Sequence, residues 1–109
     1  MSVRRIAQVI GIKPDDIEEY ERIHADVWPT VLATIKKANI QNFSIFRYEH
    51  LLFAYMEYTG TDYEKDMAII AADPETQRWW KITDPMQSQV PEARSGEWWH
   101  VIPENFHLD

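Results

Sequence analysis

The stretch EEYERIHADVWP, residues 18–29, places three aromatic side chains four residues apart: Tyr20, His24 and Trp28. On a helix, residues four apart share one face, so the phenol and the imidazole would lie side by side. An imidazole titrates near neutral pH and can accept and release protons. The spacing indicates either a proton-transfer site or a half-buried core histidine with a backbone partner, and these residues alone favour the second interpretation.

A second group of candidate residues lies in the stretch QRWWK, residues 77–81. Trp79 or Trp80 offers a flat face on which a sugar or another ring could stack, and Arg78 and Lys81 could donate hydrogen bonds to hydroxyls. The other interpretation is an amphipathic helix with two buried indoles and exposed cations. The residues themselves leave both interpretations open.

Other kinds of chemistry have no support in the sequence. The four histidines, at positions 24, 50, 100 and 107, show no metal-ligand spacing. A chain with three glycines has no glycine-rich phosphate loop, and no serine occupies a strand-turn-helix elbow. We therefore expect no metal and no cofactor, which leaves proton transfer, or simple binding, in an aromatic pocket.

The whole sequence sets the protein class. Its 109 residues suit a single domain, residues 1–109, and its net charge of −7 argues against a nucleic-acid or membrane partner. No apolar run approaches the roughly 20 residues of a membrane span, and the N-terminal segment MSVRRIAQVIGI does not resemble a signal peptide. We expect a cytoplasmic protein.

The elements that must position these residues can be predicted from periodicity. The pattern predicts a strand over 4–13 with Ile6, Ile10 and Ile12 on one face, and a helix from Pro14 to about His24. Pro29 cannot continue that helix, so a second helix should start at Trp28-Pro29 and end near Asn39. His24 would then lie at a bend, where a side chain can point into a cavity.

The second half of the chain predicts a hairpin, helices and a last strand. The hairpin covers 43–58 with its turn at Glu49-His50, and its apolar return strand should be central. A capping box at Thr61 and Glu64 starts a helix with Tyr63, Met67 and Ile70 inside; a second helical piece follows Asp73-Pro74, then a loop over 86–97 and a strand over 98–102. This order, βαββαβ, predicts the α+β ferredoxin-like arrangement. Its open sheet face would need a cover, so we expect a homodimer.

Two motifs together resemble those of the L-rhamnose mutarotase family. They are the Tyr-x-x-x-His-x-x-x-Trp-Pro spacing of residues 20–29 and the Trp-Trp-Lys of residues 79–81. The resemblance runs from Arg5 to about Trp99 and implies a dimeric α+β barrel that interconverts sugar anomers without metal or cofactor. It also implies that His24 is the catalytic acid/base and that Tyr20, Trp79 and Trp80 contact the monosaccharide.

The sequence departs from the family at two places. The family often has a substrate-contacting tyrosine where this chain has Phe43, so one hydrogen bond to the sugar should be missing. The segment QSQVPEARSGEWW, residues 87–99, looks more like relatives linked to L-fucose. The resemblance therefore implies a 6-deoxy-L-hexose, L-rhamnose first and L-fucose close behind.

From this resemblance we expect His24 to protonate the ring oxygen, with Tyr20 orienting it or the sugar. Trp28, Trp79 and Trp80 should pack on the sugar, with Phe43 and Lys81 nearby. Two other functions stay open, because fold alone fixes none. The same barrel serves cofactor-free monooxygenases, and a sugar-binding module without catalysis is also compatible.

Overall fold

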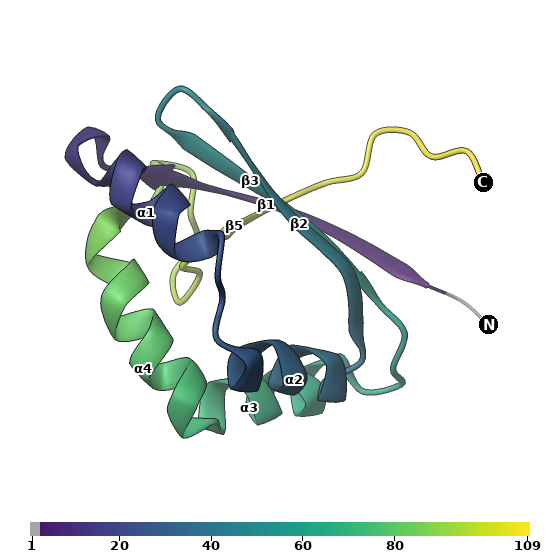
Figure 1. Cartoon of the computed structure of the whole chain (residues 1–109). Coiled ribbons are helices and arrows are strands. Elements are labelled where there is room, and N and C mark those ends of the chain that lie inside the picture. Colours follow the sequence, from purple (N-terminus) through teal and green to yellow (C-terminus); the bar gives the residue numbers. More distant parts are fainter. Residues whose placement is uncertain (1–2) are drawn as a thin grey trace.

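One antiparallel sheet and four α-helices make up the part of the chain that the computed structural model describes, residues 3–109 (Figure 1). The strands are β1 (Arg4–Ile12), β2 (Ile40–Tyr48), β3 (Leu51–Tyr58), β4 (Gln87–Ser88) and β5 (His100–Ile102). The helices are α1 (Ile17–His24), α2 (Pro29–Lys37), α3 (Tyr63–Ala72) and α4 (Pro74–Thr83), with short 3₁₀ turns η1 (Pro14–Asp16) and η2 (Asp84–Met86). No helix in this range is long and apolar enough to cross a membrane.

The sheet has the predicted ferredoxin-like order, β2-β3-β1-β4, with β3 central as expected. Two short strands share the position beside β1: β4 pairs at Gly11, and β5 pairs at Val9. The expected loop over 86–97 is therefore wrong at its start, and the last strand begins later than residue 98. A strand of only two residues, such as Gln87-Ser88, is too short to show a periodicity in the sequence.

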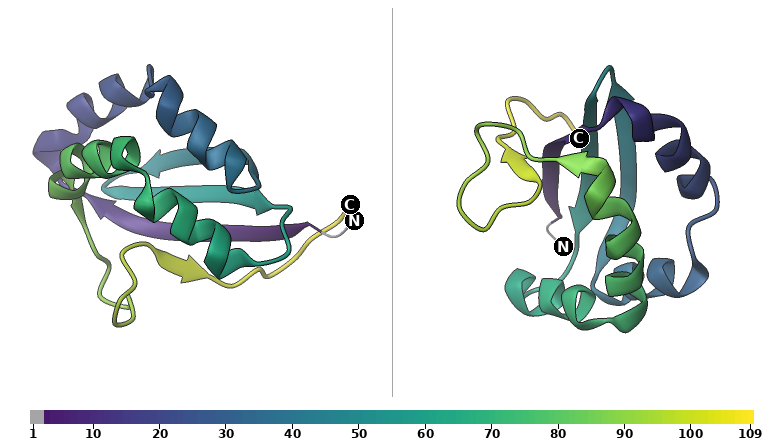
Figure 2. Two further views of the ribbon diagram at one scale, coloured as in Figure 1. Left: turned by 90° about the horizontal axis from the view of Figure 1, so that it is seen from below. Right: turned by 90° about the vertical axis from the view of Figure 1, so that its left-hand side faces the viewer.

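The helices cover one face of this sheet, as the view in the left half of Figure 2 shows. The side chains of Ile6, Ile10 and Ile12 are buried on that face, which confirms the predicted face of β1. In β3, buried and half-buried residues alternate strictly, as expected for a strand with one face on the core. The opposite face carries Phe46 and Tyr48, which are 62% and 69% exposed.

The break between α1 and α2 lies where Pro29 predicted it. Pro29 is the first residue of α2, and Trp28 holds the capping position before it. His24 is consequently the last residue of α1. At the other end of α2 the cap is Ala38, one residue before the predicted Asn39, and Asn39 itself follows with a left-handed φ of 65°.

The start of α3 corrects the predicted capping box. Asp62, not Thr61, caps this helix, and its carboxylate accepts a hydrogen bond from the Lys65 backbone N–H. Asp62 lies directly before the first turn and is an equally good cap, so the preceding threonine is not used. Tyr63 and Met67 pack against the core as predicted.

Candidate functional site

The imidazole of His24 is fixed by a backbone hydrogen bond at the end of α1. Its Nδ1 lies 2.7 Å from the carbonyl oxygen of Tyr20, one turn earlier. A carbonyl can only accept, so Nδ1 carries the proton and Nε2 is left with a lone pair whenever the ring is neutral. The last turn of the helix thus fixes the tautomer of the only ring in this stretch that can move protons at neutral pH.

Burial sets the charge state of His24. The side chain is half-buried, which lowers its pKa below the ordinary 6.5, while the bond to the Tyr20 carbonyl opposes that shift. At pH 7 the ring is therefore mostly neutral. A neutral ring with a bare Nε2 is ready to accept a proton.

A chain of ring contacts joins three parts of the molecule. The rings of Tyr20 and His24 stack with centroids 4.0 Å apart and planes at 23°. The indole of Trp79, from α4, meets His24 edge-on at 5.2 Å, and Trp28 meets Trp79 edge-on at 5.2 Å. The structure therefore brings together four of the residues singled out in the sequence, although they come from different elements.

Tyr20 is the most deeply buried member of this group, at 3% exposure. Its hydroxyl oxygen accepts a hydrogen bond from Gln87 Nε2 at 3.3 Å. Burial raises the pKa of the phenol to about 12, and the Gln87 amide opposes the rise. At neutral pH, Tyr20 is a neutral hydroxyl that keeps its proton.

A cavity of about 250 Å³ opens beside Tyr20 and His24. Its lining combines residues from the end of α1 with residues from β2 and β3: Tyr20, Glu21, His24, Ala25, Ile45, Phe46, Arg47 and Leu52. This size suits a small molecule rather than a polymer. His24 is one of the residues that line it, so a small molecule in the cavity would lie beside the imidazole.

Two charged residues at this cavity were missed by sequence reasoning. Arg47 of β2 donates from Nε to the Glu21 carboxylate of α1 at 2.6 Å, and also donates to the backbone carbonyl of Glu49. Glu21 and Arg47 are 26 residues apart, so no local spacing links them. The one available signal was an arginine next to the aromatic residues Phe46 and Tyr48 of β2.

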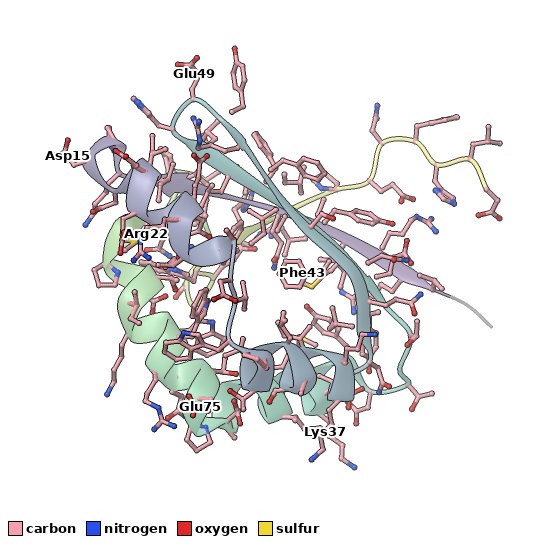
Figure 3. All side chains as sticks on the ribbon, viewed as in Figure 1. Asp15, Arg22, Lys37, Phe43, Glu49 and Glu75 are labelled. Carbon is pink, nitrogen blue, oxygen red and sulfur yellow. The ribbon has the colours of Figure 1, made fainter. Side chains whose placement is uncertain are left out.

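Five predicted residues do not line the cavity: Trp28 and Trp79, which belong to the ring contacts around His24, and Phe43, Trp80 and Lys81. Phe43 of β2 is 41% exposed and lies on the side of that strand that faces the connection between α1 and α2 (Figure 3). Trp80 is 38% exposed and Lys81 is also exposed on α4. Contacts between these five side chains and a sugar stay predictions. Within residues 3–109, no group of histidine, aspartate or glutamate side chains is placed to hold a metal ion.

Comparison with known proteins agrees with this architecture. The family model described as L-rhamnose mutarotase matches residues 5–108. An L-rhamnose mutarotase of Oceanobacillus iheyensis is 31% identical over 110 residues, 98% of this chain and 100% of that protein. An L-fucose mutarotase of Xanthomonas campestris pv. campestris is 34% identical over 114 residues, 99% of this chain and 90% of that protein.

A solved structure is similar in fold. The crystal structure of an L-rhamnose mutarotase from Formosa agariphila superposes with a TM-score of 0.77 at 19% identity, covering 97% of this chain and 99% of that one. The match of the family model over nearly the whole sequence decides the family. The chain belongs to the L-rhamnose mutarotase family.

Proposed function

We propose that this protein interconverts the α and β anomers of a 6-deoxy-L-hexose, with L-rhamnose as the first choice and L-fucose close behind. One relative more than 30% identical is named for L-rhamnose and another for L-fucose, and each alignment covers nearly the whole of this chain. The observation that carries the proposal is the fixed imidazole of His24, whose Nε2 is available beside a cavity suited to a small molecule.

The proposed chemistry is a proton transfer between two oxygens bonded to the same carbon. Nε2 of neutral His24 takes the proton from the anomeric hydroxyl, and the electrons of that O–H bond form the carbonyl. The bond from the anomeric carbon to the ring oxygen breaks, and the ring oxygen receives the proton from the imidazolium. The open-chain aldehyde rotates, and the same steps in reverse close the ring on its other face.

One imidazole can serve both steps because the two oxygens are so close together. Nε2 of His24 acts first as the base at the anomeric hydroxyl and then, in the imidazolium form, as the acid that protonates the sugar's ring oxygen. General acid–base catalysis of this kind contributes about 10²–10⁴-fold. The carbonyl of Tyr20 would hold the imidazole through both steps, since it bonds to the proton that does not move.

The remaining candidate residues would bind the sugar. The Tyr20 hydroxyl supports a role as hydrogen-bond donor, because the phenol is neutral at pH 7. Trp28 and Trp79 would supply apolar faces for the ring and the 6-methyl group. Trp80 and Lys81 would need to approach the sugar from the exposed side of α4.

The same proposal includes a homodimer in the cytoplasm. The sheet face opposite the helices exposes Phe46 and Tyr48, and a second copy of the chain would cover them. Sedimentation at micromolar concentration should therefore give twice the chain mass, and Phe46→Asp should give a monomer. A wild-type monomer would contradict the dimer, and recovery in the membrane fraction of lysed cells would contradict the location.

Saturation-transfer NMR tests the activity directly. Exchange between the anomeric proton signals is measured for L-rhamnose, L-fucose and their non-deoxy analogues, with and without protein. We expect acceleration for the two 6-deoxy sugars and a smaller effect on the analogues. Binding without accelerated exchange would indicate a sugar-binding module, and the proposal would then be wrong.

A further inference from the structure

Gln87 has a buried side chain with a partner at each end. The residue is 6% exposed and lies in β4, next to Ile12 of β1. Its Nε2 donates to the Tyr20 hydroxyl at 3.3 Å, and its Oε1 accepts from Trp98 Nε1 at 2.8 Å. These two hydrogen bonds link a loop tryptophan to the phenol of the site through one amide.

The partner on the loop side determines the direction of the whole chain of hydrogen bonds. An indole N–H can only donate, so the atom that faces Trp98 must be the amide oxygen. The amide nitrogen of Gln87 must then face Tyr20, and the phenol oxygen receives one of its protons. This orientation follows from the donor inventory and not from the shape of the amide.

The phenol of Tyr20 is therefore left with an unused proton. Among residues 3–109, the structure gives the Tyr20 hydroxyl a donor partner, Gln87, and gives it no acceptor. Tyr20 lines the cavity beside His24. The oxygen of this hydroxyl is already engaged by Gln87, and its proton is available to a ligand that reaches the phenol.

We propose that Gln87 and Trp98 are positioning residues that make Tyr20 a hydrogen-bond donor toward a sugar oxygen in the cavity. This inference rests on the proposed function, because it names the sugar as the acceptor. Burial keeps the phenol neutral at the pH of the reaction, which the donor role requires. The amide of Gln87 acts through Tyr20 and does not itself touch the ligand.

The loop before β5 is built to hold the indole in place. The carboxylate of Glu97 accepts hydrogen bonds from the backbone N–H groups of Arg94 and Val101 and also pairs with His100. These bonds hold the pKa of Glu97 down to about 2, so the carboxylate stays charged and the turn stays closed at neutral pH. Trp98 follows Glu97 directly, so the hydrogen bonds of Glu97 also restrict where Trp98 lies.

The next residue strengthens the link to Tyr20. Trp99 packs against the core cluster that contains Tyr20, Ile10 and Leu52. The two indoles of the pair thus have separate tasks: Trp98 orients the amide by a hydrogen bond, and Trp99 packs against the phenol's own cluster. This explains why a segment outside regular structure carries adjacent tryptophans.

Replacing the amide by a carboxylate reverses the polarity while keeping the shape. In the Gln87→Glu variant, the new side chain still accepts from Trp98 but must also accept from Tyr20, which turns the phenol proton away from the cavity. We expect kcat/KM for anomer exchange to fall about tenfold, mainly through KM, the size of one hydrogen bond. Asn105→Asp, the same change from amide to carboxylate at an exposed residue of the C-terminal segment, is the matched control and should leave exchange unchanged.

Two further variants separate polarity from stability. Trp98→Phe keeps a ring but removes the donor, so the amide can turn over, and exchange should fall about threefold. In a Tyr20→Phe background, Gln87→Glu should have no further effect, because no phenol proton remains. If Gln87→Glu lowers the melting temperature without changing KM, or adds its full loss to Tyr20→Phe, the residue is merely structural and the inference is wrong.

NMR tests the chain of hydrogen bonds independently of catalytic activity. Tyr20→Phe should shift the Gln87 side-chain amide signals, and Gln87→Glu should shift the Trp98 indole N–H signal. Unchanged signals would overturn the inference even if the wild type is active. If the wild-type protein accelerates anomer exchange of no sugar on the panel and binds none, both the proposed function and the donor role of Tyr20 are wrong. If the wild type is active and Gln87→Glu has the same kcat/KM, only the inference about Gln87 is wrong.

Discussion

The candidate site has two contrasting sides. The helix wall is a group of rings that touch one another, Tyr20, His24 and Trp79. The strand wall is the part of β2 that carries Phe43, Phe46 and Arg47, of which Phe46 and Arg47 line the cavity. On the helix side, Tyr20 is 3% exposed and Trp79 is 7% exposed, and both contact His24. On the strand side, Phe43 is 41% exposed and Phe46 is 62% exposed. The first wall is part of the core, and the second is a rim on the outermost strand of the sheet.

This difference separates two tasks. A group that moves protons must keep one geometry and one tautomer, which buried neighbours and a backbone hydrogen bond enforce for His24. A side chain that selects among similar sugars needs only to contact a hydroxyl by which those sugars differ. It can be substituted without destabilising the fold. We therefore expect changes to the helix wall to reduce rate or stability, and changes to the strand wall to alter sugar preference.

The largest expected effect comes from His24→Ala. Removing the imidazole should slow anomer exchange by at least about 10²-fold, because no other group takes over the proton transfer. Saturation-transfer NMR measures the rate, and circular dichroism checks that the fold persists. His50→Ala, at the exposed hairpin turn, is the matched control and should behave as wild type. Undiminished exchange by His24→Ala would remove the imidazole from the mechanism.

The second largest effect should distinguish adjacent tryptophans. Trp79→Ala removes a buried indole in contact with two other rings and should cost about 3–5 kcal/mol of unfolding free energy. Trp80→Ala alters a side chain that is 38% exposed and should cost less than about 1 kcal/mol. Urea titrations of the pair provide the comparison, and equal losses would show that the helix wall is not part of the core.

On the strand wall, Arg47→Gln should change sugar binding more than stability. The ion pair between Arg47 and Glu21 is partly exposed, so its loss should cost at most about 1 kcal/mol of unfolding free energy. Both residues line the cavity, and the loss of the guanidinium should raise KM about tenfold. Exchange kinetics against sugar concentration measure KM; an unchanged value would place the sugar away from this rim.

The smallest expected effect is that of Phe43→Tyr. The new hydroxyl restores the family's usual residue and should favour L-rhamnose over L-fucose by about threefold in kcat/KM. Stability should change by less than about 0.5 kcal/mol, because Phe43 is exposed. Exchange rates for both sugars, measured side by side, give the ratio. A shift toward L-fucose would mean that this position does not explain the preference.

The sequence predicted the helix wall far better than the strand wall. Tyr20, His24 and Pro29 follow a local rule, the helix period and its interruption by proline, so their places could be predicted. Trp79 was predicted only as one of two adjacent candidates, Trp79 and Trp80. Which of the two indoles is buried depends on how α4 packs, and the sequence does not show it. Local rules describe what lies within one or two turns of a helix.

Contacts between distant segments escaped prediction for a physical reason. Gln87 meets Tyr20 across 67 positions, and Arg47 meets Glu21 across 26. Such pairs depend on how elements dock, and a polar side chain in a short strand has no periodicity that reveals its partner. The general order of the sheet was predictable because it follows from hydrophobic runs.

The most direct test of the catalytic role of His24 compares the pH dependence of anomer exchange with the titration of the His24 ring. If His24 is the acid/base, the exchange rate rises as the imidazole loses its proton, because the neutral ring takes the anomeric proton first. The midpoint should lie below 6.5, since burial lowers the pKa of His24, and it should match the midpoint of the His24 ring signals in NMR. A rate that falls as His24 deprotonates, or that ignores its titration, would contradict the account.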